Sequence, residues 1–319
     1  MPARYLDFGS SPRLTNADTR ITIEQRTPRW HHGDVAIRDA LDFWSFAGAA
    51  ANVVMQLSWP EVGYGVAESR VKSGSLMEHP WKRARTTTQY LAVAILGTEE
   101  ERAAYRDAVN GAHRQVLSTD ASPVRYNAFN RELQMWVAAC LFVGFEDTYE
   151  LLHGAMTEEQ AEQFYRTAQP LGTTLQVTAD QWPATRADFD VYWNTACERV
   201  AIDDHIREYL MALVDLKMIR WPLRVTFGPL LRFLTIGALA PVFRDAMGLH
   251  WSEADRRRFE NLFVFVSFVN RFLPRFIRQG ASQLLMGDVR PTPDPAKEGP
   301  HLRPSGTRTG RPSRLLRAP

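Results

Sequence analysis

Four short segments of this chain carry the same helix-start signal. Each has Ser or Thr followed three residues later by Glu, Gln or Asp, and each precedes a run with helical spacing of apolar residues. The four are Thr98–Glu101, Thr157–Gln160, Thr185–Asp188 and Ser252–Asp255. In such a capping box, the two side chains bond to backbone N–H groups that the first turn leaves free. No alternating strand pattern bounded by hairpin turns accompanies them. The sequence therefore predicts an all-α fold.

Apolar spacing sets the extent of the predicted helices. The clearest is Phe129–Leu152, where apolar or small residues recur on one face for about six turns. Ile37–Leu57 is apolar or small nearly all round, which predicts a central helix. The other predicted helices are Lys82–Leu96, 98–116, Asp203–Lys217, Pro229–Met247 and one from Ser252 to about Arg278. We expect a single multi-helix domain over residues 31–288, preceded by an irregular segment, 1–30.

The composition changes sharply after Gly287. Residues 289–319 hold seven Pro, and seven Lys or Arg against two acidic residues. A segment with so few apolar residues cannot offset its ordering entropy, so we expect a disordered basic tail. The tail carries a net charge of +5, and the whole chain carries +2. Residues 1–288 therefore carry a net charge of −3. A slightly acidic body predicts no specific binding of nucleic acid, and a role for the tail in such binding ranks last.

Two further counts exclude whole classes of protein. Cys140 and Cys197 are too few for a disulfide scaffold or a four-cysteine zinc site, and they predict a reducing, cytoplasmic setting. The longest apolar stretches are Ala40–Leu57, Phe227–Phe243 and Leu262–Ile277. Each contains a charge and is shorter than the roughly 20 residues that cross a bilayer. We expect buried core helices, with peripheral membrane contact through Phe227–Phe243 as the alternative.

His113 is the histidine that the sequence places best for chemistry. It lies within the predicted helix 98–116, where Tyr105, Val109 and Val116 share its face. A histidine in this position is most often a satisfied core residue. The functional alternative is a buried neutral imidazole that binds a metal through one ring nitrogen.

The preceding helix brings two more polar side chains toward His113. Gly97 and Thr98 form a short turn, which predicts an antiparallel helical hairpin. At roughly 1.5 Å per residue, Arg83 lies about 21 Å before the turn and His113 about 24 Å after it, so both lie at one level. Thr87 shares the face of Arg83 one turn on. An imidazole, a guanidinium and a hydroxyl together suit a haem, with the imidazole on iron and the guanidinium on a propionate or on bound oxygen.

The alternative for Arg83 is a solvated charge at a helix end, and Arg85 competes with it for the same role. No phosphate-binding glycine motif, zinc-peptidase motif or nucleophile elbow occurs elsewhere in the chain.

At this point the sequence resembles a known family: the catalytic domain shared by mpaB-type oxygenases and the latex clearing protein, a rubber oxygenase. The most specific part is Arg83-x-x-x-Thr87, ten residues before Gly97 and followed by a His inside the next helix. The resemblance spans roughly residues 35–275. The matching stretches are Asn52–Ser69, His79–Gly97, AHRQV around His113, Tyr126–Leu141 and Leu230–Ser252.

The resemblance implies an all-α, globin-like core and a b-type haem whose proximal ligand matches His113, with Arg83 and Thr87 beside the haem. It implies dioxygen-dependent cleavage of carbon–carbon double bonds in an isoprenoid chain. We therefore predict a haem-dependent oxygenase with an apolar, isoprenoid or lipid-like substrate. Ala138 and Trp59 stand where many members carry His. A haem- or lipid-binding helical protein without catalysis is the alternative.

Overall fold

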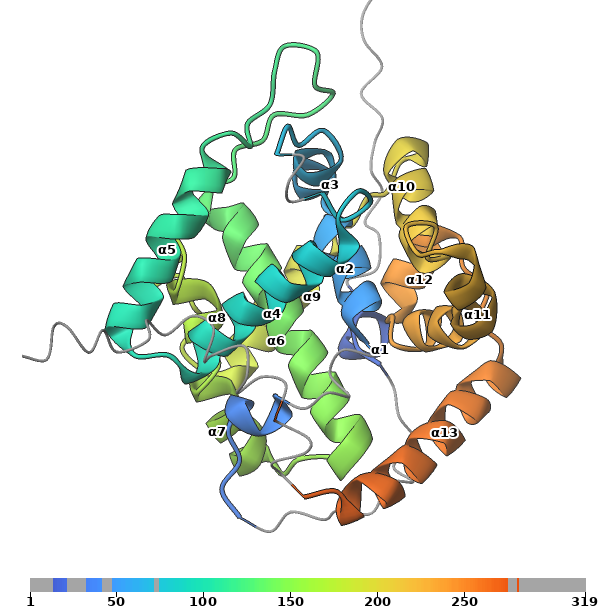
Figure 1. Ribbon diagram of the computed structural model, residues 1–319. Coiled ribbons are helices and arrows are strands. Elements are labelled where there is room, and N and C mark those ends of the chain that lie inside the picture. Colours follow the sequence, from blue (N-terminus) through green and yellow to red (C-terminus); the bar gives the residue numbers. More distant parts are fainter. Residues whose placement is uncertain (1–13, 22–32, 42–47, 72–74, 275–279, 281–319) are drawn as a thin grey trace, which may run out of the picture.

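The structure is a computed structural model that describes residues 14–21, 33–41, 48–71, 75–274 and 280. Its regular elements are helices (Figure 1), and the described residues contain one isolated antiparallel bridge, between Leu117 and Asn127. The predicted all-α class is confirmed. In chain order the elements are α1 (Asn16–Thr19), the 3-10 helix η1 (Ile37–Ala40), α2 (Ala49–Leu57), α3 (Pro60–Ala67), α4 (Pro80–Leu96), α5 (Glu99–His113), α6 (Arg131–His153), α7 (Glu158–Arg166), α8 (Pro170–Thr173), α9 (Arg186–Cys197), α10 (Asp204–Val214), α11 (Trp221–Gly237), α12 (Pro241–Met247) and α13 (Glu253–Phe272).

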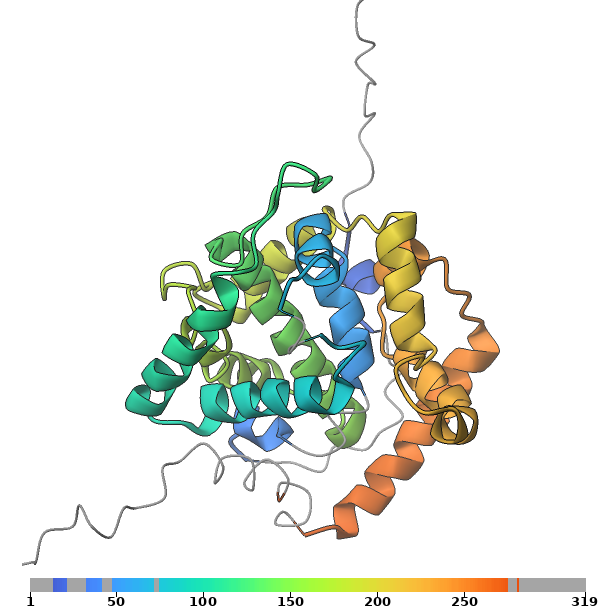
Figure 2. The ribbon, with the colours of Figure 1, turned by 45° about the horizontal axis from the view of Figure 1, so that its top comes forward.

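The long helix α6 is the centre of the fold. It begins at Asn130, whose side chain accepts hydrogen bonds from the N–H groups of Glu132 and Leu133, and it ends at Gly154, where φ is 85°. Such a positive φ favours glycine and stops the helix. Most side chains of α6 are buried. Helices η1, α2, α8 and α13 pack against it (Figures 1 and 2). Two of these, η1 and α8, in turn pack against α4, which bears part of the candidate site.

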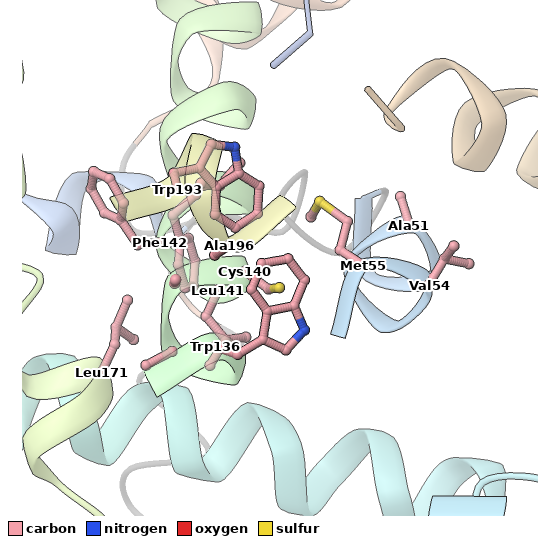
Figure 3. Packing of buried hydrophobic residues seen from close by; sticks show 14 of the residues in the cluster. Ala51, Val54, Met55, Trp136, Cys140, Leu141, Phe142, Leu171, Trp193 and Ala196 are labelled. Atoms are coloured by element: carbon pink, nitrogen blue, oxygen red, sulfur yellow. The ribbon is translucent and has the colours of Figure 1, made fainter. Parts of the chain in front are cut away.

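Stacked tryptophans fill the space between α6 and its neighbours. The ring centroids of Trp59 and Trp136 are 4.7 Å apart, and those of Trp136 and Trp193 are 5.1 Å apart. Figure 3 shows Trp136 and Trp193 with Met55 of α2. Each indole N–H donates to a backbone carbonyl, which satisfies the one polar group of each ring. The core is therefore both apolar and fully hydrogen bonded at this point.

The segment Ile37–Leu57, predicted as one central helix, is divided into two elements. The turn η1 ends at Leu41, whose backbone (φ −74°, ψ 65°) is not helical, and α2 begins after it; residues 42–47 lie outside the described residues. The N–H of Ile37 donates to Thr167 Oγ1 (2.9 Å), and Ile37 is buried. Tertiary contacts here override the helical propensity of the segment, so the prediction of one continuous helix was wrong.

Prolines divide or shorten two other predicted helices. The predicted helix Pro229–Met247 is split between α11 and α12, because Ala240 precedes a proline and takes an extended backbone. Helix α13 ends at Phe272 and not near Arg278, since Leu273 also precedes a proline. Helix α5 ends at His113, three residues earlier than predicted. This last difference places His113 at a helix end.

Two predictions concern segments that the structure describes little. Residues 289–319 and most of 1–30 lie outside the described residues, so the basic tail and the division into segments stay predictions. Among the helices that the structure does describe, none is long and apolar enough to cross a bilayer.

Candidate functional site

Helices α4 and α5 form an open pair that carries the three candidate residues. They meet at Gly97 and Thr98, where the predicted capping box of Thr98 with Glu101 is present. Near this junction, Arg102 Nε donates to the carbonyl of Ala94 (3.1 Å) and ties the helices together. Beyond it they diverge, so that the ends with Arg83 and His113 lie apart (Figures 1 and 2). The predicted hairpin therefore exists as a wedge and not as two parallel rods.

His113 is the last residue of α5 and is half-buried. Its ring meets the ring of Phe129 edge to face, with centroids 6.2 Å apart. Its Nδ1 atom is buried and has no hydrogen-bond partner. Burial is the main reason that the pKa of His113 is lowered, and the positive charge of Arg83 lowers it further. Burial and Arg83 thus both disfavour the protonated imidazole, and Nδ1 stays buried without a hydrogen-bond partner.

Arg83 lies in the first turn of α4, without an acidic partner among the residues that the structure describes. Water reaches the side chain, yet protein atoms surround it closely enough that desolvation lowers its pKa. The hydroxyl groups of Tyr209 and Tyr105 lie close enough to act on this pKa in the opposite direction. The guanidinium of Arg83 is thus exposed to water at its surface and packed against protein atoms on its other sides.

Thr87 lies one turn after Arg83 on α4 and is exposed. The backbone next to it is held by α5, because Tyr105 donates its hydroxyl hydrogen to the carbonyl of Thr86 (2.9 Å). Arg85, the competing arginine, is also exposed on α4. The structure thus places Arg83 and Thr87 on α4 and His113 on the diverging helix α5. The positive charge of Arg83 lowers the pKa of His113.

A set of hydrogen bonds that the sequence analysis missed fixes the orientation of α5. Arg106 donates to the carbonyls of Thr174 (2.8 Å) and Thr173 (3.0 Å). Gln176 donates its side-chain N–H to Asn110 Oδ1 (2.7 Å). Arg106 and Asn110 precede His113 by seven and three residues, so all three share a helical face. That spacing was visible in the sequence, but the carbonyls that it meets come from a distant segment.

The two positions at which the family resemblance leads us to expect His are closed core in this chain. Trp59 is 1% exposed, and the guanidinium of Arg199 lies over its ring, 3.6 Å from the ring centroid. Ala138 of α6 is buried against α8. A Cβ atom added to Gly172 of α8 would lie only 3.4 Å from the Cβ atom of Ala138. Neither position offers a polar atom to a ligand. Both are filled by packing.

A small hollow lies beside the segment that follows His113. Its volume is about 140 Å³, and its lining includes Gln115, Glu68 and Tyr126. Glu68 accepts hydrogen bonds from the hydroxyls of Tyr126 (2.8 Å) and Ser122 (2.6 Å). These bonds tie α3 to the loop between α5 and α6. The hollow is thus a polar neighbour of the site that the sequence analysis did not find.

The described residues contain no group of three or more His, Cys, Asp or Glu side chains that could hold a metal ion. His113 does not belong to such a group in the described part of the chain.

Comparison with known proteins identifies the relatives of the chain. Residues 37–268 match the profile of a family described as ER-bound oxygenase mpaB/B'/rubber oxygenase, catalytic domain. Two uncharacterized proteins, one from Mycobacterium bovis and one from Mycobacterium tuberculosis, are each 49% identical over 241 residues. The aligned region covers 76% of this chain and 94% of each relative. No solved structure matches the chain, so the globin-like core stays a prediction.

Proposed function

The chain belongs to the family of mpaB-type and rubber oxygenases, and from that premise we propose that it is a haem-dependent oxygenase acting on an apolar, isoprenoid or lipid-like substrate. The observation that carries the proposal is the buried, unpaired Nδ1 of His113 on a neutral imidazole. Leaving such an atom without a partner costs about 1–3 kcal/mol, which a ligand can recover.

The residues present fit a b-type haem. A porphyrin supplies four nitrogen donors of its own, so one imidazole on the protein side is enough. His113 is the residue that would hold the iron. Arg83 lacks a carboxylate partner in the described structure, and its planar guanidinium matches a propionate carboxylate. Thr87, one turn away, offers a hydroxyl at the same end of α4.

The chain and the cofactor divide the work. When bound, the haem supplies the dioxygen chemistry. Burial disfavours the protonated imidazole, and the bonds of Arg106 and Asn110 hold α5 in place. Arg83 adds a positive charge without a carboxylate partner among the described residues. Phe129 meets the imidazole edge to face.

An absorption spectrum of the purified protein, with iron quantified per chain, tests the haem assignment. We expect a Soret band that is lost in His113→Ala and retained in the control His250→Ala, since His250 is exposed and far along the chain. Arg83→Ala should weaken haem binding by about tenfold, the loss of one charge-assisted hydrogen bond. A Soret band of full intensity in His113→Ala would refute His113 as the ligand.

One observation favours a second candidate, a haem carrier without catalysis. Trp59 and Ala138 are packed into the core at positions where the family resemblance leads us to expect His. Oxygen consumption by the haem-loaded protein with a polyprenyl substrate separates the two functions. Consumption that falls in Arg83→Ala supports the oxygenase, whereas a Soret band without any consumption supports the carrier.

A further inference from the structure

We propose that the corner formed by the N-terminal ends of α4 and α11 docks onto a bilayer surface that contains anionic phospholipids. We call this surface the tryptophan corner. Its members are Trp81, Lys82, Lys217, Arg220, Trp221, Leu223, Arg224 and Phe227.

The first observation is exposed apolar surface. Trp81 is 72% exposed and Trp221 is 67% exposed, each in the first turn of its helix. Leu223 and Phe227 are about half exposed. Between Trp221 and Leu231 the side chains are apolar on nearly every side of α11, and most of them are exposed. A helix that is hydrophobic all round normally lies in an apolar surrounding, so this end of α11 lacks one.

The second observation is that the two helix ends lie toward the same side of the molecule. Figures 1 and 2 place the end of α4 that follows α3 on the side that faces α10 and α11. Helix α10 joins them, because it packs against α11 and because Tyr209 of α10 lies close enough to Arg83 to affect its pKa. The two exposed tryptophans therefore belong to one edge of the molecule and can meet one surface together.

The third observation is charge. Residues 75–87 and 215–232 contain seven Lys or Arg against two acidic residues, a net of +5. Because residues 1–288 carry −3 in total, the remainder of that region carries −8. Of the two acids, Asp215 pairs with Arg232, while Glu78 is exposed. Lys82, Lys217 and Arg220 are exposed. The positive charge of the body is thus concentrated where the exposed tryptophans lie.

Together these features match a membrane surface. Tryptophan is favoured at the level of the lipid headgroups, and each Lys or Arg near an anionic leaflet contributes about 1 kcal/mol. No described helix can cross the bilayer, so contact would be interfacial, with the apolar end of α11 inserted beneath the headgroups. A second copy is a poorer occupant, because a symmetric interface would bring two surfaces of +5 together.

Docking at the tryptophan corner would also bring Arg83 to the membrane, and the meaning of this rests on the proposed function. Arg83 is two residues from Trp81, so docking would hold the Arg83 end of α4 at the membrane, where an apolar substrate is dissolved. The docking itself does not depend on haem.

Vesicle flotation of the full chain tests the proposal. The vesicles contain phosphatidylcholine alone or mixed with phosphatidylglycerol. We expect binding to the mixed vesicles that weakens with salt, and a blue shift of tryptophan fluorescence.

The double variant Trp81→Ala/Trp221→Ala should bind about tenfold more weakly and lose the blue shift. The double variant Lys217→Glu/Arg220→Glu should also bind about tenfold more weakly. Val191→Ala, at a residue 69% exposed on α9, is the matched control and should bind like the parent.

Several results would overturn the proposal. Equal binding by the parent and both double variants would assign vesicle binding to another surface, such as the basic C-terminal segment. Equal binding to both vesicle types would show that binding does not require an anionic lipid. Absence of parental binding, with a dimer that Trp81→Ala/Trp221→Ala dissociates, would assign the corner to a second copy. His113→Ala should bind vesicles normally, so loss of the haem assignment and loss of this proposal give different results.

Discussion

Two groups of partly buried charged side chains lie in this molecule, and they differ in whether their charges are paired. In the C-terminal half of α6, Glu146 is bonded to Arg186 (2.8 Å from each carboxylate oxygen) and to Arg20, while Asp147 is bonded to Arg20 (2.7 Å). At the α4–α5 wedge, Arg83 has no carboxylate partner in the described structure, and Nδ1 of His113 has no hydrogen-bond partner. The charges of the first group are paired within the chain, although Arg20 Nη1 makes no hydrogen bond. The charge of Arg83 has no such pairing among the described residues.

The pKa values of the two groups follow the same division. Burial raises the pKa of Glu146, but its two arginines more than offset this and hold the pKa below its usual range. Asp147 has a raised pKa, because burial outweighs its single arginine. At the wedge, burial and Arg83 both act to lower the pKa of His113, so nothing opposes the shift. The shifts at Glu146 and Asp147 thus include the effect of an opposite charge, whereas the shift at His113 does not.

Removing a paired charge should have the largest effect. We expect Arg20→Ala to lower the free energy of unfolding by about 3–5 kcal/mol, because it leaves Asp147 and one side of Glu146 buried without a counter-charge. Urea unfolding followed by circular dichroism measures this loss. Arg125→Ala is the control, since its ion pair with Asp120 is almost fully exposed and should contribute little. Equal losses in the two variants would show that pairing in α6 does not stabilise the fold.

A smaller effect is expected at the edge of the paired group. Burial raises the pKa of Glu150 to about 6, above the 4.5 of an ordinary glutamate. The folded state therefore holds this proton more tightly than the unfolded state, and its contribution to stability falls as pH rises from about 4.5 to about 6. Glu150→Gln keeps the acceptor for the N–H of Met156 and removes the charge. It should raise the free energy of unfolding by about 1–2 kcal/mol at pH 7.5, with no gain at pH 4. Urea titrations at the two pH values decide this, and an equal change at both would contradict it.

The smallest effect on stability is expected at the wedge. Because the Nδ1 atom of His113 makes no hydrogen bond, His113→Gln in the haem-free protein should change the free energy of unfolding by about 0.5 kcal/mol or less at pH 7.5. The lowered pKa means that wild-type stability is lost as pH falls below about 6.5, while the variant lacks this loss. Denaturant titrations at pH 7.5 and 5.5 measure both. A loss of several kcal/mol at pH 7.5 would make His113 a structural residue and remove the contrast between the two groups.

The candidate site shows how far spacing and resemblance lead. Arg83 and His113 were selected because a straight antiparallel hairpin puts them at one level, and the structure does bring the charge of Arg83 within reach of the imidazole. The hairpin is nevertheless an open wedge (Figure 2). Helix α4 packs against η1 and α8, of which α8 lies far away in sequence. The bonds of Arg106 and Asn110 to the segment after α8 depend on the same long-range contacts.

The sequence by itself determined where helices start. The capping boxes at Thr98, Thr157 and Ser252 are present as predicted, and Thr185 accepts a hydrogen bond from the N–H of Asp188. These bonds join residues three apart, so the local chain is sufficient to form them. Only the tertiary structure decided that α6 is the central helix, that Ile37–Leu57 is divided, and that Arg20 is paired while Arg83 is not. Each of those outcomes depends on which distant residue comes within a few ångströms, and local propensity carries no information about that.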